Sequence, residues 1–208
     1  MSKQRVMILL SGCGPLDGSD PFESVFCHYW LEKKGCEVIY AAPSGTQLHS
    51  VNHIDGKNSR TQKRVILQEA ARLVRGKLFP RKELSPKLMD GIVIPGGQGT
   101  PKNYFSLNKN KIHEIRSEIR LFLKRHVESR GTVLAISLSE FVVRRSLPDL
   151  KDAPDLLSLK PGQFVSNEEL GVVLSPGSLL SSSTTTLFIE TERVVSEFMN
   201  IMMKRKSS

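Results

Sequence analysis

Gly131-Thr-Val-Leu-Ala-Ile-Ser137-Leu-Ser139-Glu140-Phe141 is the stretch that decides the fold of this chain. Residues 132–136 are nearly all aliphatic or β-branched, which is typical of a strand covered on both faces of a parallel sheet. No polar loop separates this strand from the helix predicted after it, so the chain must turn sharply at Ser137. A side chain at such a corner is expected to face a cleft, which is the layout of a nucleophile elbow.

The elbow departs from the pattern of hydrolases in one respect. The glycines of Gly-x-Ser-x-Gly, which relieve backbone strain, are replaced by Ala135 and Ser139. The sequence around the corner is therefore weak evidence alone, and its interpretation depends on the rest of the chain.

Predicted strands and helices alternate along the sequence. Apolar runs predict strands, and amphipathic periods bounded by capping residues and glycines predict helices. The strands are expected at residues 6–11, 37–41, 90–97, 132–136 and 171–175, and the helices at 20–34, 62–75, about 112–126 and from 181–186 to about 203. Residues 77–88 and 98–103 are predicted connectors, and residues 147–169 show no clear period.

This order predicts an α/β three-layer sandwich with a mostly parallel central sheet and right-handed crossovers. We expect one domain over residues 1–208, with a basic disordered tail at residues 204–208. In such sheets the ligand crevice lies at the carboxyl ends of the strands. Residues 12–14, residues 96–99 and Ser137 all occupy such ends.

Composition places the chain among ordinary globular proteins. Its 208 residues are 39% hydrophobic and 25% charged, and no apolar run approaches the ~20 residues that cross a bilayer. The first residues lead directly into a strand, so we expect no signal peptide and a cytoplasmic protein, with a mitochondrial location as the alternative. The three cysteines lack the spacing of a zinc site and are expected to be reduced. No metal or cofactor is expected.

The balance of charge is basic. Thirty lysines and arginines against 21 acidic residues give a net charge of +9 and a pI near 9.6. Such a charge favours contact with nucleic acid, a large complex or another anionic partner. The excess is scattered, apart from Arg144-Arg145 and residues 204–206, so general solubility is the interpretation we favour.

Four motifs resemble one known family. SGCGPLDGSDPFE (residues 11–23), VNHIDG (51–56), RVILQEAARLVRGKL (64–78) and IVIPGGQGTPKN (92–103) are similar to the ElbB-like glyoxalase group. That group belongs to the PfpI-like superfamily of class I glutamine amidotransferase-like proteins. The resemblance implies a flavodoxin-like fold, a homodimer, and cofactor-independent chemistry on a small carbonyl metabolite.

The resemblance also implies a site. Family members carry an elbow cysteine beside a glutamate of the first helix, and the matching positions here are Ser137 and Glu23. The pocket and oxyanion positions that the resemblance implies are Gly12, Cys13, His53, Gly96, Gly97 and Asn103. Glu23 has a second interpretation, as the partner of Asp20 in a capping box. Beyond the elbow the family pattern is compressed, and its Thr-Thr-Pro-Ala segment reads Leu174-Ser-Pro-Gly177.

The missing cysteine decides between functions. A serine hydroxyl is a much weaker acid than a thiol and normally needs an adjacent imidazole base, and no histidine has a spacing that places it beside Ser137. We therefore favour a catalytically degenerate protein that binds a small ligand or serves in an assembly. An active glyoxalase, deglycase or amidohydrolase using Ser137 and Glu23 is the first alternative. A basic subunit of a nucleoprotein or organellar complex is the second.

Overall fold

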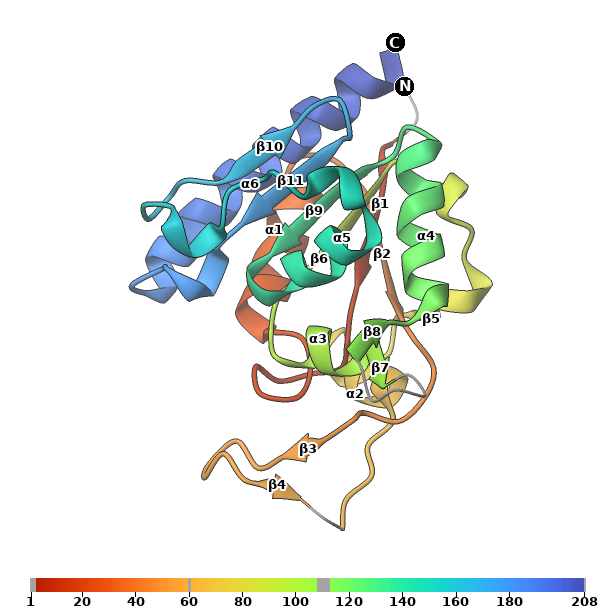
Figure 1. Ribbon diagram of the computed structural model, residues 1–208, viewed down its shortest axis with the longest axis vertical. Helices are drawn as coiled ribbons and strands as arrows, with labels where there is room; N and C mark the ends of the chain where they lie inside the picture. The colour runs from red at the N-terminus through yellow and green to blue at the C-terminus, as the bar shows by residue number, and fades with distance from the viewer. Residues whose placement is uncertain (1–2, 60, 108–112, 208) are drawn as a thin grey trace.

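The structure, a computed structural model, describes residues 3–59, 61–107 and 113–207. Its centre is a seven-stranded sheet in the order β10-β11-β9-β6-β1-β2-β5 (Figure 1). All neighbouring strands are parallel except β10 and β11. The bounds are β1 Arg5–Leu9, β2 Glu37–Ala42, β5 Phe79–Pro80, β6 Gly91–Ile94, β9 Thr132–Ile136, β10 Val165–Asn167 and β11 Val172–Ser175. The predicted α/β fold with a mostly parallel sheet is confirmed.

Helices cover both faces of this sheet. Helices α1 and α6 lie side by side behind it, and α4 and α5 lie in front (Figure 1). The α-helices are α1 Pro21–Lys33, α2 Ile66–Leu73, α3 Gly99–Asn103, α4 Ser117–Glu128, α5 Glu140–Ser146 and α6 Thr184–Ser207. Short 3₁₀ helices are η1 Arg81–Glu83, η2 Pro86–Leu88, η3 Ser137–Ser139, η4 Pro148–Leu150, η5 Leu156–Ser158 and η6 Gly177–Leu179. In the described part of the chain no helix has the length and apolar character needed to span a membrane.

Successive side chains of β1 point to opposite faces of the sheet and contribute to two separate layers of the core. Val6 and Ile8 pack with Phe198 of α6, whereas Met7 and Leu9 pack with Ile119 of α4. Successive side chains of a strand point to opposite faces, so a strand that is apolar throughout must be covered on both. Burial of these residues holds the strand ends, and with them the elbow, in fixed positions.

Two small hairpins stand outside the main sheet. Strands β3 Ser50–Val51 and β4 Asn58–Ser59 are antiparallel and project from the body of the molecule (Figure 1). Strands β7 Phe105–Leu107 and β8 His113–Ile115 form the second hairpin, next to the start of α4.

Three predictions from sequence were wrong in detail. Helix α4 begins at Ser117 because Ile115 pairs with Phe105 in β8, and Ile112 lies outside the described residues. Residues 99–103, predicted as a loop, form α3, in which a proline is tolerated because it lies in the first turn. The predicted disordered tail instead continues α6 through Ser207, and residue 208 lies outside the described residues.

The basic residues at this end are tied to the body of the protein. Lys204 Nζ lies 2.8 Å from Glu168, and Lys206 Nζ lies 2.8 Å from Asp90. These contacts join the end of α6 to residues far away in sequence, and exposed ion pairs of this kind contribute little to stability.

Candidate active site at the elbow

The chain turns at Ser137 in a strained conformation. Ser137 has a φ of +54°, in the left-handed region that residues other than glycine rarely adopt, and it follows directly on β9. Ser139 Oγ fixes the corner, since it accepts the amide of Ile136 at 2.7 Å and donates to the carbonyl oxygen of Ile94 at 2.6 Å. The serine that replaces the usual glycine thus supplies polar contacts that hold the turn.

The hydroxyl of Ser137 points at Glu23. Ser137 Oγ donates a hydrogen bond of 2.5 Å to Glu23 Oε1. The same oxygen lies 3.0 Å from the carbonyl oxygen of Pro176 and 3.1 Å from Ser178 Oγ. The structure therefore brings the two predicted catalytic residues together, although they are separated by 114 positions in sequence.

Glu23 is fully buried and its carboxylate is fully engaged. Oε2 accepts the amide of Gly96 at 2.6 Å, and Oε1 also accepts the amide of Ser178 at 2.9 Å. Burial raises the pKa of Glu23, and hydrogen bonds from Ser137 and Ser178 oppose the rise. A buried carboxylic acid with this shift takes up a proton more readily than an exposed one.

The capping-box interpretation of Glu23 is half right. Asp20 Oδ1 accepts the amide of Glu23 at 3.0 Å and so caps α1. The side chain of Glu23, however, is directed to the elbow, and the amide of Asp20 donates to the carbonyl oxygen of Gly96 at 2.9 Å. The glutamate therefore belongs to the elbow site.

The expected cleft in front of Ser137 is closed. Ser137 is only 1% exposed, because the turn formed by residues 176–178 lies on its hydroxyl. A Cβ added to Gly177 would come 2.8 Å from Ser137 Oγ. Five cavities of about 270 to 690 Å³ in the described part of the chain are lined by neither Ser137 nor Glu23. The prediction that the corner presents its side chain to open space was wrong.

The two glycines predicted as oxyanion donors have packing roles. The amide of Gly96 is already bonded to Glu23, and a Cβ on Gly96 would come 2.5 Å from Cβ of Ser137. Gly97 has a φ of +98°, and a Cβ there would come 2.4 Å from the carbonyl oxygen of Gly18. Gly96 leaves room for the side chains of Ser137 and Glu23, and Gly97 allows the backbone of residues 18–20 to approach closely.

The other predicted pocket residues lie around the loop after β1. Gly12 and Cys13 pack closely against Gly18, which has no room for a side chain. Asn103 is buried and joins segments of this loop, since its Nδ2 donates to the carbonyl oxygen of Ser11 at 2.7 Å. Its Oδ1 accepts the amide of Leu48 at 2.9 Å, which ties the loop before β3 to α3. Asn103 thus acts as a structural bridge.

His53 is part of the projecting hairpin. Its Nδ1 lies 3.1 Å from the carbonyl oxygen of Val51, and its Nε2 accepts the amide of Leu16 at 3.3 Å. Among the described residues, the hydrogen-bond partners of Ser137 Oγ are Glu23, Pro176 and Ser178. The elbow serine therefore has a carboxylate beside it and, within that described part, no imidazole.

The cysteines offer no replacement nucleophile. Cys13 is partly exposed, Cys27 and Cys36 are buried, and all three are free thiols, as predicted. Burial raises the pKa of Cys13, which disfavours the reactive thiolate. Within the described ranges, no group of three or more histidine, cysteine or acidic side chains is placed to hold a metal ion.

Ser178 is the site residue that sequence reasoning missed. Its amide and hydroxyl contact the two central residues of the elbow. The only signal for it was its position directly after the Leu174-Ser-Pro-Gly177 segment, which matched a family motif loosely.

Comparisons with known proteins agree with this architecture. No family model matches the chain. The chain is 38% identical over 123 residues to the mitochondrial ES1 protein homolog of Rattus norvegicus, a match that covers 59% of this chain and 46% of that protein. It is also 38% identical over 121 residues to a mitochondrial glutamine amidotransferase-like class 1 domain-containing protein 3 of Homo sapiens, covering 58% and 45%. The matched region thus spans about half the length of these relatives.

Solved structures show the same fold. An isoprenoid biosynthesis protein with an amidotransferase-like domain from Ehrlichia chaffeensis superimposes with a TM-score of 0.84 at 22% identity, covering 94% of this chain and 99% of that one. Glyoxalase III from Candida albicans superimposes with a TM-score of 0.54 at 13% identity, covering 93% and 96%. Similarity at these identities reports on the fold alone. Together with the sequence relatives, it confirms that the chain resembles class I glutamine amidotransferase-like proteins, as its motifs predict.

Proposed function

We propose that this chain is a catalytically silent ES1-like protein that acts through its surface and not through chemistry at Ser137. One observation carries the proposal: the hydroxyl at the elbow is bonded to Glu23 and covered by the turn of residues 176–178, with 1% of the residue exposed. A nucleophile must come within about 3–3.5 Å of a substrate atom, and this one is enclosed by the protein.

The chemistry of the elbow supports the same conclusion. A serine needs a base to remove its proton and donors to stabilise the anion that forms in the substrate. The base at hand is the carboxyl of Glu23, and the amide of Gly96 that could act as a donor is bonded to that carboxyl. Freeing the donor would require Glu23 to leave the position from which it contacts Ser137.

The alternative is a cofactor-independent enzyme acting on small carbonyl compounds. The 2.5 Å contact between Ser137 and Glu23 favours it, because the pair has the geometry for proton transfer. The test is the conversion of methylglyoxal by the wild-type protein and by Ser137→Ala. We expect both to match buffer alone, and turnover that Ser137→Ala abolishes in a folded protein would refute the proposal.

A cysteine placed at position 137 distinguishes two explanations for an inactive elbow: the loss of the nucleophile, or the closure of the site around it. In Ser137→Cys, alkylation by iodoacetamide is followed at each cysteine by peptide mapping. We expect the new thiol to react more slowly than Cys13, which is partly exposed, because the enclosing turn remains. Rapid alkylation together with methylglyoxal turnover would show that the elbow opens and that only the cysteine is missing.

The surface supports a role in assembly. Phe22, Val25 and Tyr29 form an exposed apolar stripe on α1, with exposed fractions of 56%, 50% and 43%. Phe188 of α6 extends this stripe, since its ring lies 5.5 Å from that of Tyr29. Phe188 is itself only partly exposed, and a group of apolar side chains exposed on one face favours a protein interface. We propose that a second copy of this chain covers it, because the patch is apolar and lies on two helices that pack against each other.

Light scattering after size exclusion tests this homodimer. The double variant Phe22→Ser with Tyr29→Ser should shift the protein from dimer to monomer, whereas Lys33→Ser, an exposed change on the same helix, should not. A monomeric wild-type protein would refute the homodimer.

The names of the ES1 relatives describe mitochondrial proteins, which supports the mitochondrial alternative for this chain over the cytoplasmic one.

A further inference from the structure

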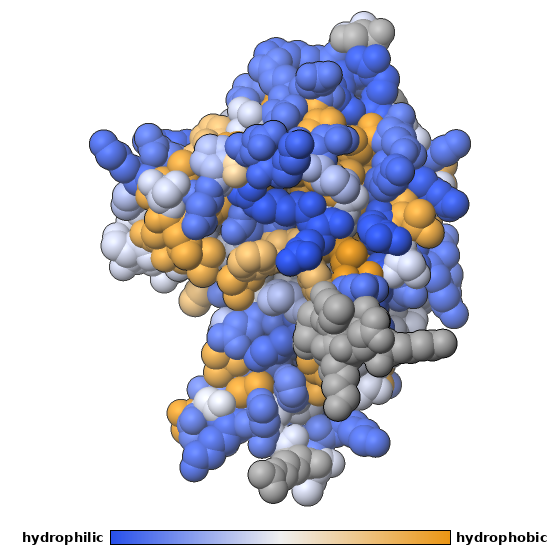
Figure 2. Space-filling view, viewed as in Figure 1, coloured by the Kyte–Doolittle hydropathy of each residue, from blue (hydrophilic) through white to orange (hydrophobic). Residues whose placement is uncertain are grey.

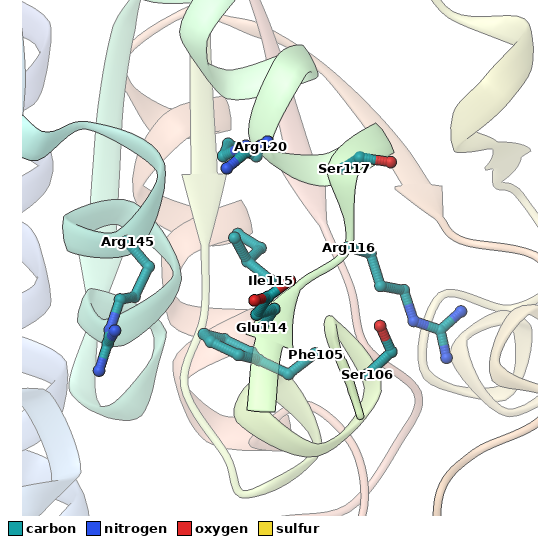
Figure 3. A pocket seen from close by; sticks show the side chains of 8 residues that line it. All are labelled: Phe105, Ser106, Glu114, Ile115, Arg116, Ser117, Arg120 and Arg145. Carbon is teal, nitrogen blue, oxygen red and sulfur yellow. The ribbon is translucent and has the colours of Figure 1, made fainter. Parts of the chain in front are cut away.

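A basic cavity lies on the front face of the molecule, away from the elbow serine. Its volume is about 400 Å³, within the range of small-molecule sites. The walls come from the β7–β8 hairpin, the start of α4 and the end of α5 (Figure 3). In Figure 3, Arg145 lies to the left of the cavity, Arg120 lies above it and Phe105 lies below it. Hydrophilic residues dominate the surface over α4 and α5 (Figure 2).

The lining is dominated by positive charge. It holds Arg116, Arg120 and Arg145 against one carboxylate, that of Glu114. Within the described part of the chain, the guanidinium groups of Arg120 and Arg145 have no hydrogen-bond or ion-pair partner. Arg116 lines the cavity with the base of its side chain, and its guanidinium extends away from the centre (Figure 3).

The neighbouring residue Arg144 is an arginine whose guanidinium is bonded within the protein, and it serves as a comparison for Arg145. Its Nε lies 2.8 Å from Glu140, and its terminal nitrogens donate to the carbonyl oxygens of Ala153 at 2.8 Å and Pro154 at 2.5 Å. The two consecutive arginines thus have different roles. Arg144 is fully partnered within the protein, whereas Arg145 is exposed and lines the cavity.

The start of α4 adds to the positive potential. Ser117, its first residue, lines the cavity, and the N-cap residue Arg116 provides no side-chain acceptor for the first-turn amides. Amides at the start of a helix favour an anion, and hydroxyls such as those of Ser106 and Ser117 can donate to its oxygens.

We propose that this cavity binds the phosphoryl group of a small phosphorylated metabolite. Guanidinium groups bind phosphate oxygens in pairs of parallel hydrogen bonds, and Arg120 of α4 and Arg145 of α5 both line the cavity. Phe105 supplies an apolar wall for the carbon part of the ligand. The proposal is independent of the state of Ser137, since neither residue of the elbow pair lines this cavity.

Isothermal titration calorimetry with ribose 5-phosphate as the probe tests the site at fixed ionic strength. We expect Arg120→Ala and Arg145→Ala each to weaken binding about tenfold, because each removes charge-assisted hydrogen bonds. Arg125→Ala is the matched control: it removes the same charge from an exposed position of α4 that does not line the cavity. It should leave the affinity unchanged.

The outcomes separate a site from general electrostatic attraction. Inorganic phosphate should compete with ribose 5-phosphate, and ribose alone should not bind. Equal weakening by all three variants, or no binding of ribose 5-phosphate at millimolar concentration, would overturn the proposal. Binding of a ten-nucleotide RNA without binding of ribose 5-phosphate would also overturn it, and would favour a nucleic-acid surface. Thermal unfolding of each variant verifies that the fold is retained.

Discussion

Gly177 lies directly over the hydroxyl of Ser137. A Cβ built on Gly177 would come 2.8 Å from Ser137 Oγ, 2.7 Å from Glu23 Oε1 and 2.3 Å from a methyl carbon of Ile136. The residue also has a φ of +49°, which disfavours a side chain whatever the space. The close cover of the elbow thus depends on a residue without a side chain.

We therefore expect Gly177→Ala to lower the free energy of unfolding by about 1–3 kcal/mol from overpacking, in addition to about 1 kcal/mol of backbone strain. Gly35→Ala is the control, because Gly35 has a φ of +84° and no other atom would lie within 4 Å of a Cβ added there. It should show the strain alone. Urea unfolding of the two variants measures the difference, and equal losses would mean that the turn moves aside freely.

The adjacent arginines of α5 give a second prediction. Arg144→Ala should destabilise the protein by about 1–3 kcal/mol, since it removes bonds to a buried glutamate and to two carbonyl oxygens. Arg145→Ala should change stability by less than about 0.5 kcal/mol, because its side chain has no partner in the described structure. Thermal or urea unfolding compares them. A larger loss for Arg145→Ala would assign that residue a structural role.

The elbow shows what local sequence patterns can predict. Residues 132–136 are β9 with the expected bounds, and Ser137 and Glu23 meet as the resemblance implied. The strand can be predicted from the sequence because a strand that is buried on both faces consists of a continuous run of apolar residues. The contact between Ser137 and Glu23 depends on how β9 and α1 are placed in the fold, so it can be predicted once the fold is known.

The closure of the elbow could not be predicted in the same way. It depends on the turn of residues 176–178, whose distance from Ser137 is set by the packing of β11 against β9. The prediction of where α4 starts was wrong for a related reason. Ile115 fits a helical period, yet its backbone pairs with Phe105. In both cases a tertiary contact overrides a local pattern that was itself consistent.

The buried carboxyl of Glu23 gives a prediction on pH. Burial raises its pKa above the ordinary value of 4.5, so the folded protein holds this proton more tightly than the unfolded chain. The stability associated with the proton is fully present below about pH 4.5 and is lost as pH rises through the folded pKa. Relative to Glu23→Gln, which cannot titrate, the wild-type protein should therefore lose stability as pH increases across this window.

Urea unfolding of both proteins at a series of pH values from about 4 to 8 measures this difference. Glu118→Gln, an exposed change on α4 that removes the same charge, is the control. If the wild-type protein instead gained stability relative to Glu23→Gln with rising pH, the hydrogen bonds from Gly96, Ser137 and Ser178 would outweigh burial. Glu23 would then be a stabilised carboxylate. In that state it could accept the proton of the Ser137 hydroxyl as a general base, which would favour the enzyme alternative.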